Sequence, residues 1–298
     1  MTSPAAIEWS ADRASIDRAL TALCDRYAAT LDEPVASVVR YALLGSGKRL
    51  RGLLVLAAYR AAGGSDDASA LAAAVEVVHA YSLIHDDLPC MDDDDVRRGR
   101  PTTHRVFGVR AATVAGVSMV PLAAAAAFEA IAALGLPPDI GGRVVAELMR
   151  ASGASGMVGG QLLDLQGEGS PLDVLELEQI HRGKTGALIR AAAVVGGLAA
   201  RASAPRLAAL ATFGESTGIA FQIVDDVLDV TATTERLGKT AGRDRDLGKS
   251  TYPALLGLES AAERARSLIA HGRSALVSAG LLSPELDALA AFAVERER

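Results

Sequence analysis

Two clusters of aspartates are the residues of this sequence best suited to do chemistry. The first is Asp86-Asp87-Leu88-Pro89-Cys90-Met91-Asp92-Asp93-Asp94-Asp95, and the second is Asp225-Asp226-Val227-Leu228-Asp229. Carboxylates at this density repel one another unless a cation lies between them. Because ligands that are all oxygen favour a hard cation, the clusters predict magnesium binding.

The first cluster follows an apolar stretch that predicts a helix ending near Asp86. A run of acids is most often a solvated loop, and that interpretation stays open for the run taken alone. Pro89 disfavours helix at Leu88, so the chain is expected to loop out and to let Asp92 turn back towards Asp86. Converging carboxylates favour a bound cation over a solvated loop.

The second cluster lies in an otherwise apolar stretch, residues 219–230. At about 100° per residue, a helix places Gln222 and the three aspartates Asp225, Asp226 and Asp229 on one polar stripe. Ionised carboxylates on a buried helix must be paired or bound to metal, so a structural salt-bridge stripe is the alternative. Neither cluster has the spacing of an EF-hand loop.

Basic side chains that could hold a phosphate-bearing substrate occur along the same chain. Magnesium held by a few carboxylates usually shares its remaining positions with water and phosphate oxygens. Each cation alone is more often a solvated charge, and a lone histidine is as often a core residue, so the prediction rests on their number. The candidates are Lys48, Arg51, His79, Arg97, Arg98, Lys184, Lys239 and Lys249.

Helices are predicted to position these side chains. Half of the 298 residues are hydrophobic and only 4% are aromatic, which favours helices packed through small residues over a sheet sandwich. Without an obvious linker, residues 1–298 are predicted to form one all-α domain of ten or more helices, with no convincing strand. The periodicity places helices at residues 11–31, 35–44, 51–62, 67–87, 111–134, 139–151, 172–180, 187–200, 206–230 and 252–278.

Charge and cysteine content limit the location and the partners. A formal net charge of −6 argues against a nucleic-acid binder. Cys24 and Cys90 cannot make a disulfide framework, and no charged-then-apolar leader precedes Glu8, so a cytoplasmic location is expected. The most apolar window, residues 117–133, is interrupted by polar residues and a proline. It predicts a core helix, with no stable membrane insertion.

Together these motifs resemble the trans-isoprenyl diphosphate synthases, and most closely the bacterial farnesyl diphosphate synthases. The resemblance covers nearly the whole chain, and both aspartate motifs occur in order with the basic positions between and around them. Its landmarks are Gly47-Lys48-Arg49-Leu50-Arg51, residues 79–89, Arg97-Arg98-Gly99-Arg100-Pro101-Thr102, Gly159-Gly160-Gln161, Gly183-Lys184-Thr185-Gly186, residues 221–226 and Gly248-Lys249-Ser250-Thr251-Tyr252-Pro253.

The resemblance implies a helical bundle around a deep central cavity, usually a homodimer, that joins isopentenyl diphosphate head to tail to an allylic diphosphate such as dimethylallyl or geranyl diphosphate. It implies that Mg²⁺ is bound by Asp86, Asp92 and Asp225, supported by Asp87, Asp226 and Asp229. It implies that isopentenyl diphosphate is gripped by Lys48, Arg51, His79 and Arg98, and that the allylic diphosphate is held by Arg97, Lys184, Lys239 and Lys249. Thr185 and Gln222 would face the allylic chain, and the candidate catalytic residues are Arg97, Lys184, Thr185 and Gln222.

The resemblance also predicts the product length. In the family, bulky residues four and five positions before the first aspartate act as a floor, and here these positions are Ser82 and Tyr81. An aromatic Tyr81 predicts a fifteen-carbon product, farnesyl diphosphate, with a geranylgeranyl or geranyl product as the alternative. Tyr81 could instead be a plain core aromatic. The sequence departs from the family pattern at Gly52, where relatives usually have Pro, and at Val117, where they commonly have Asp.

Three other functions remain to be weighed against this one. A terpene cyclase uses similar aspartates but has no second diphosphate to bind, whereas this chain keeps Lys48, Arg51 and His79. A non-catalytic partner subunit would be expected to have lost an aspartate motif. A metal-dependent diphosphate hydrolase needs a general base and a placed water, and nothing in the sequence singles these out.

Overall fold

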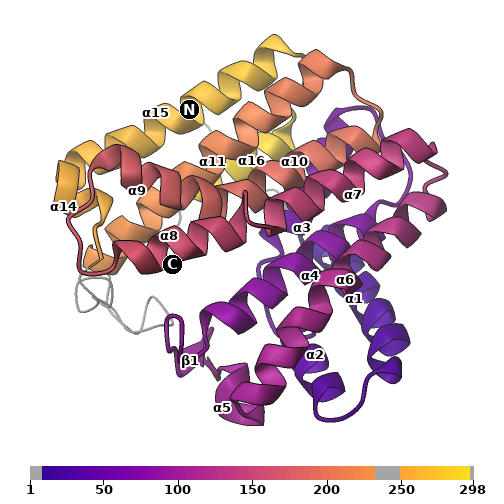
Figure 1. The fold of residues 1–298 in the computed structure, drawn as a ribbon. Helices are drawn as coiled ribbons and strands as arrows, with labels where there is room; N and C mark the ends of the chain where they lie inside the picture. The colour runs from indigo at the N-terminus through magenta and orange to yellow at the C-terminus, as the bar shows by residue number, and fades with distance from the viewer. Residues whose placement is uncertain (1–8, 232–248, 296–298) are drawn as a thin grey trace.

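The architecture is almost entirely helical in the computed structural model, which describes residues 9–231 and 249–295 (Figure 1). The N-terminal half forms α1 (Ser10–Tyr27), η1 (Ala28–Thr30), α2 (Val35–Leu43), α3 (Leu50–Ala61), α4 (Ser69–Asp86), α5 (Thr103–Phe107) and α6 (Val109–Ala133). The C-terminal half forms α7 (Pro138–Ser152), α8 (Met157–Gly167), α9 (Val174–His181), the π-helical turn η2 (Arg182–Gly186), α10 (Ala187–Ala199), α11 (Ala204–Thr231), α14 (Tyr252–Leu256), α15 (Leu258–Ser278) and α16 (Pro284–Glu295). The prediction of an all-α fold with ten or more helices is confirmed.

Helices α4, α10 and α11 form the centre of the bundle. Helix α4 packs against α3 and α6, α10 packs against α3, α7 and α11, and α15 lies along α11. Small residues make the close packing possible. A Cβ added at Gly196 of α10 would lie 2.4 Å from the carbonyl oxygen of Val55 in α3, so these two helices can approach this closely only with glycine at that position.

The structure differs from the predicted elements in several places. The helix predicted over residues 252–278 is broken, because Gly257 has φ of +81° and separates α14 from α15. Helices α5, α8 and α16 were not predicted. A two-residue hairpin, β1 (Val96–Arg97) with β2 (Arg100–Pro101), follows the first aspartate cluster. Helix α3 begins at Leu50, after Arg49 in a left-handed conformation, so Lys48 lies before the helix.

Two helices, α6 and α11, are long and apolar enough to cross a membrane by length and composition. Half of the most apolar window of α6 and 61% of that of α11 are buried inside the protein. Core helices of water-soluble proteins meet the same criterion, so this finding is weak evidence for a membrane span.

Candidate active site

The first aspartate cluster folds back on the end of α4. The backbone N–H of Asp92 donates to the carbonyl oxygen of Asp86 at 2.9 Å, and the N–H of Asp93 donates to that of Leu88 at 3.1 Å. The expected return of Asp92 towards Asp86 is therefore confirmed. It follows from the helix ending before Pro89, which leaves the last carbonyls of α4 to accept hydrogen bonds from the loop.

Both aspartate motifs face one cavity of about 210 Å³. Asp86 lies at the end of α4, Asp92 lies in the loop that follows, and Asp225 lies on α11. The same cavity is lined by Arg97, Asp164, His181, Lys184, Gln222, Asp226 and Lys249. Segments more than 130 residues apart in the chain thus present acids and bases to a common space.

Two lysines and two aspartates that line this cavity form an ion-pair cluster. The ammonium of Lys184 lies 2.7 Å from Asp164 and 3.6 Å from Asp92, and that of Lys249 lies 3.1 Å from Asp164 and 3.2 Å from Asp92. Burial alone would raise the pKa of both carboxyls, but the two ammoniums outweigh it and lower the pKa of Asp92 and of Asp164. All four groups are therefore charged at neutral pH. The two ammoniums are thus able to bind an anion such as a diphosphate.

The turn η2 carries Lys184 into the cavity because two backbones touch. A Cβ added at Gly160 of α8 would lie 2.1 Å from the backbone nitrogen of Lys184, and one at Gly183 would lie 2.9 Å from the Cα of Gly160. Single π-helical turns of this kind are frequent at functional sites. The hydroxyl of Thr185 in the same turn donates to Oε1 of Gln222 on α11 at 2.9 Å.

Asp226 has a different environment from Asp225. It is only 3% exposed and accepts hydrogen bonds from the backbone N–H of Tyr252 at 3.1 Å and from the side chain of Gln222 at 3.4 Å. These contacts link the second motif to α14. Asp226 is thus bound by the protein itself, which fits the supporting role that the resemblance implies for it.

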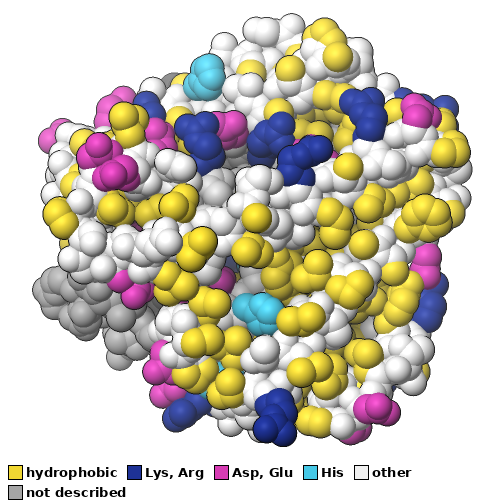
Figure 2. Space-filling view, in the orientation of Figure 1, with side chains coloured by type: hydrophobic (Ala, Val, Ile, Leu, Met, Phe, Trp, Pro, Cys, Tyr) yellow, Lys and Arg dark blue, Asp and Glu magenta, His cyan; other side chains and the backbone are white. Residues whose placement is uncertain are grey.

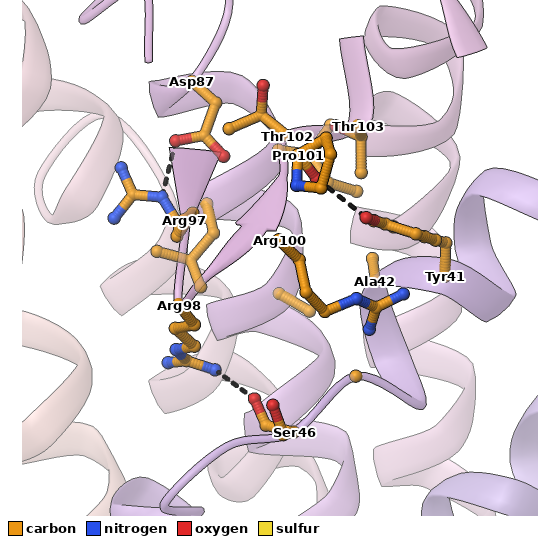
Figure 3. Close-up of a pocket in the computed structure, with 14 residues that line it drawn as sticks. Tyr41, Ala42, Ser46, Asp87, Arg97, Arg98, Arg100, Pro101, Thr102 and Thr103 are labelled. Carbon is orange, nitrogen blue, oxygen red and sulfur yellow. Dashed lines mark hydrogen bonds and ion pairs between the residues drawn. The ribbon is translucent and has the colours of Figure 1, made fainter. Parts of the chain in front are cut away.

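Arginines surround a second pocket, next to the β hairpin (Figure 3). Arg97 donates to Asp87 at 2.5 Å and to Asp94 at 3.0 Å, so it is fixed by the first cluster itself. Arg98 points away from the first aspartate cluster, towards the loop before α3, and donates to the carbonyl oxygen of Ser46 at 3.4 Å (Figure 3). Burial raises the pKa of Asp87 to about 6 against the opposing pull of Arg97.

The residues predicted to grip isopentenyl diphosphate are brought together only in part. The guanidinium of Arg98 lies 3.2 Å from Nε2 of His79. Burial, followed by the nearby arginines, lowers the pKa of His79 well below its usual value, so it is neutral and can accept this hydrogen bond. Arg51 is close enough to His79 to help lower its pKa, and burial lowers the pKa of Arg51 itself to about 10. The ammonium of Lys48 instead lies over the ring of Phe292, 5.0 Å from its centre.

Tyr81 is buried inside the bundle, one helical turn before His85 on α4. It is 4% exposed, its hydroxyl donates to the carbonyl oxygen of Ser152 at 2.8 Å, and its ring meets that of His85 edge to face at 6.0 Å. These contacts are consistent with a plain core aromatic and with a rigid floor that limits product length. The role of Tyr81 as that floor stays a prediction. Lys239 lies outside the described residues.

Sequence reasoning missed Asp164, which contacts both Lys184 and Lys249. The sequence did contain a signal for this residue, because Asp164 is an acidic residue that follows the landmark Gly159-Gly160-Gln161 by three residues on α8. Its side chain reaches the lysines from the helix whose glycines allow η2 to approach.

Among residues 9–231 and 249–295, no three acidic, histidine or cysteine side chains are already grouped as a metal centre. The cavity still offers carboxylates from both motifs, the donor type that Mg²⁺ prefers. Burial raises the pKa of Asp86, which means that its charged form lacks full compensation from the protein.

Comparison with known proteins identifies the family. The sequence matches the polyprenyl synthetase family over residues 32–276. It is 47% identical over 274 residues to the farnesyl diphosphate synthase of Escherichia coli (strain K12), covering 89% of this chain and 90% of that protein. It is 48% identical over 242 residues to geranylgeranyl pyrophosphate synthase 12, chloroplastic, of Arabidopsis thaliana, covering 78% of this chain and 66% of that protein. The solved structure of the Helicobacter pylori geranyltransferase complexed with magnesium and isoprenyl diphosphate matches with a TM-score of 0.81 at 29% identity, covering 99% and 98% of the two chains. The chain therefore belongs to the polyprenyl synthetase family and is a prenyltransferase.

Proposed function

We propose that this protein joins isopentenyl diphosphate head to tail to dimethylallyl and geranyl diphosphate, and that its main product is farnesyl diphosphate. The observation that carries the proposal is the cavity in which Lys184 and Lys249 meet Asp92 and Asp164 between the two aspartate motifs. A diphosphate requires such cations, and these cations are held in place before it arrives.

The first step breaks the allylic carbon–oxygen bond and leaves a diphosphate anion and an allylic cation. Preorganised positive groups stabilise charge as it develops on the leaving group, and in this cavity those groups are Lys184, Lys249 and Arg97. The hydroxyl of Thr185 donates a hydrogen bond to Gln222, which lines the same cavity.

We propose that Asp86, Asp92 and Asp225 hold Mg²⁺ when the allylic diphosphate binds. Bound Mg²⁺ would neutralise the diphosphate and favour its departure. The raised pKa of Asp86 and the carboxylates that both motifs present to one cavity support this assignment. The H. pylori geranyltransferase was solved with magnesium, which is consistent with it.

In the second step the double bond of isopentenyl diphosphate forms a new carbon–carbon bond to the allylic cation, and the resulting cation loses a proton to the departing diphosphate. We assign Arg51, His79, Arg98 and Lys48 to the isopentenyl diphosphate. No protein nucleophile is required. An apolar surrounding matters, because water would convert the cation to an alcohol.

The product length is tested by incubating the protein with isopentenyl diphosphate, geranyl diphosphate and Mg²⁺, followed by chain-length analysis. We expect farnesyl diphosphate, loss of turnover with a chelator, and recovery on adding Mg²⁺. Geranylgeranyl diphosphate is the second candidate, because a synthase of that name is 48% identical. An alcohol or a cyclic product, with no condensation, would reject the proposal.

The division into two diphosphate sites is tested separately. Arg51→Ala should raise KM for isopentenyl diphosphate far more than KM for geranyl diphosphate, whereas Lys184→Ala should act on the allylic side. Equal effects of Arg51→Ala on the two KM values would show that Arg51 is assigned to the wrong substrate.

We further propose that the chain is one domain and that it acts in the cytoplasm.

We also propose that the protein forms a homodimer through α6. Three hydrophobic side chains of α6 are exposed: Val114 (49%), Val117 (60%) and Phe128 (69%). At about 100° per residue they lie within one narrow face of the helix. Hydrophobic side chains also gather over the region of α4 and α6 in Figure 2. A second copy would cover this face.

A further inference from the structure

A buried side chain, that of Arg49, contacts both ends of the loop between α2 and α3, residues 44–49. Arg49 is 9% exposed. Its Nη2 donates to the carbonyl oxygen of Gly45 at 2.8 Å and to that of Leu43 at 3.1 Å, and its Nε donates to Asp17 of α1 at 2.8 Å. One guanidinium thus joins the end of α2, the loop and α1.

The backbone of Arg49 is strained in order to allow this. It has φ of 54° and ψ of 33°, a left-handed conformation that costs free energy for any residue other than glycine. Such strain persists only where the surroundings enforce it, and it is common at functional positions. Here the conformation turns Arg49 inward, leaves its neighbour Lys48 exposed and lets α3 begin at Leu50.

The same loop supports Arg98. Arg98 is another of the four non-glycine residues with positive φ among the described residues, and it donates to the carbonyl oxygen of Ser46. A Cβ added at Gly47 would lie 2.8 Å from Nη1 of Arg98 and 3.3 Å from Nη1 of Arg49. Gly47 therefore lies between the two guanidiniums, and the shape of the loop decides where Arg98 rests.

Resting on the proposed function of this site, we propose that Arg49 is a positioning residue for isopentenyl diphosphate. Its guanidinium holds residues 44–49 in the conformation that presents Lys48 and supports Arg98. We assign it no direct contact with the substrate, because Arg49 is buried and its Nε and Nη2 already donate to Asp17, Leu43 and Gly45. It acts through its neighbours.

The test compares three variants in the condensation assay. Arg49→Gly keeps a residue suited to the left-handed conformation but removes the guanidinium. We expect it to raise KM for isopentenyl diphosphate about tenfold or more, while KM for geranyl diphosphate and kcat stay within about twofold. Arg49→Lys should be intermediate, because an ammonium cannot reproduce the fork of hydrogen bonds. Asp17→Asn is the matched control and should behave like the parent, since Asp17 is half exposed and both carbonyl contacts remain.

A double-mutant cycle distinguishes positioning from general destabilisation. If Arg49 acts through Lys48, the effects of Arg49→Gly and Lys48→Ala on this KM should be clearly less than additive. Additive effects, equal changes in both KM values, or a lower Tm with both KM values unchanged would each overturn the proposal. If Arg49→Gly does not fold, the same comparison is decided with Arg49→Lys. Failure of the parent protein to condense the substrates would instead reject the proposed function.

Discussion

At the scale of single residues, the two lysines of the site form ion pairs with carboxylates of the same site. Lys184 and Lys249 share Asp92 and Asp164, so four charges compensate one another before any substrate binds. Charged groups removed from water need such partners. Asp92 is also a proposed magnesium ligand, whereas Asp164 has no assigned metal role. We infer that Asp164 keeps the lysines in place when Asp92 turns to the metal.

We therefore predict that Asp164→Asn lowers kcat about 10- to 100-fold, the effect expected from losing one or two hydrogen bonds between charged groups. Steady-state kinetics with geranyl diphosphate measure it. Glu168→Gln is the control, because Glu168 lies 3.5 Å from Lys249 but is more exposed, and its loss should change kcat less than about threefold. Similar kinetics in the two variants would contradict a special role for Asp164.

At the scale of elements, the active site depends on places where helices come unusually close. The turn η2 can approach α8 only because Gly160 and Gly183 lack side chains. This contact places Lys184 opposite Asp164 of α8 and Thr185 opposite Gln222 of α11. The geometry of the allylic site is therefore a packing property as much as a property of its charged residues.

Gly160→Ala should greatly reduce activity, because its methyl group would lie 2.1 Å from the backbone nitrogen of Lys184 and the turn would have to move. We expect a loss of at least about tenfold in kcat/KM for geranyl diphosphate, together with a lower Tm. Gly142→Ala on α7 is the matched control, because an added Cβ there meets nothing within 4 Å. That change should leave activity unchanged and raise stability by roughly 0.4–1 kcal/mol. Full activity in Gly160→Ala would show that the close approach is not needed.

Tyr81 tests whether α4 also sets the product length. It lies five residues before Asp86, about 7.5 Å along the helix axis, where the tail of a growing chain would pass if it follows α4. Tyr81→Ala should yield products of twenty carbons or more, measured by chain-length analysis. Tyr81→Phe loses only the hydrogen bond to Ser152 and should still give fifteen carbons. An unchanged product from a folded, active Tyr81→Ala variant would reject the floor.

At the scale of the whole molecule, the exposed apolar face of α6 is the feature that a single chain leaves unexplained. Helix α6 packs against α2, α4, α5 and α7, yet it exposes Val114, Val117 and Phe128. Exposed apolar groups of this kind mark interaction sites when they are contiguous. Val117, one of the two positions at which the resemblance implies a departure from the family pattern, lies on this face.

We predict that the protein is a dimer in solution and that Phe128→Glu weakens the dimer by at least about tenfold in Kd, since a charge would be buried at the interface. Sedimentation velocity over a concentration series measures the change. Val277→Glu is a control, because Val277 is 61% exposed but belongs to α15. Equal effects of the two changes would contradict α6 as the interface, and a monomeric parent protein would reject the homodimer.

The sequence by itself determined the fold class and the family. Helical periodicity extends over most of the chain, and local rules such as the break at Pro89 were enough to predict the return of Asp92 towards Asp86. The two acidic motifs were recognisable because charged side chains in an apolar stretch must be paired or bound to a metal when they are buried. The helical periodicity and the acidic motifs both depend on residues that are close together in the sequence.

Only the tertiary structure decided which distant residues meet. Asp164 is paired with two lysines 20 and 85 residues further along the chain. Arg49 reads as one more basic residue of a motif, and only its burial and its left-handed backbone separate it from Lys48 and Arg51. The physical reason is that periodicity reports which face of a helix is buried, whereas a hydrogen bond or a close backbone approach depends on the packing of several elements together.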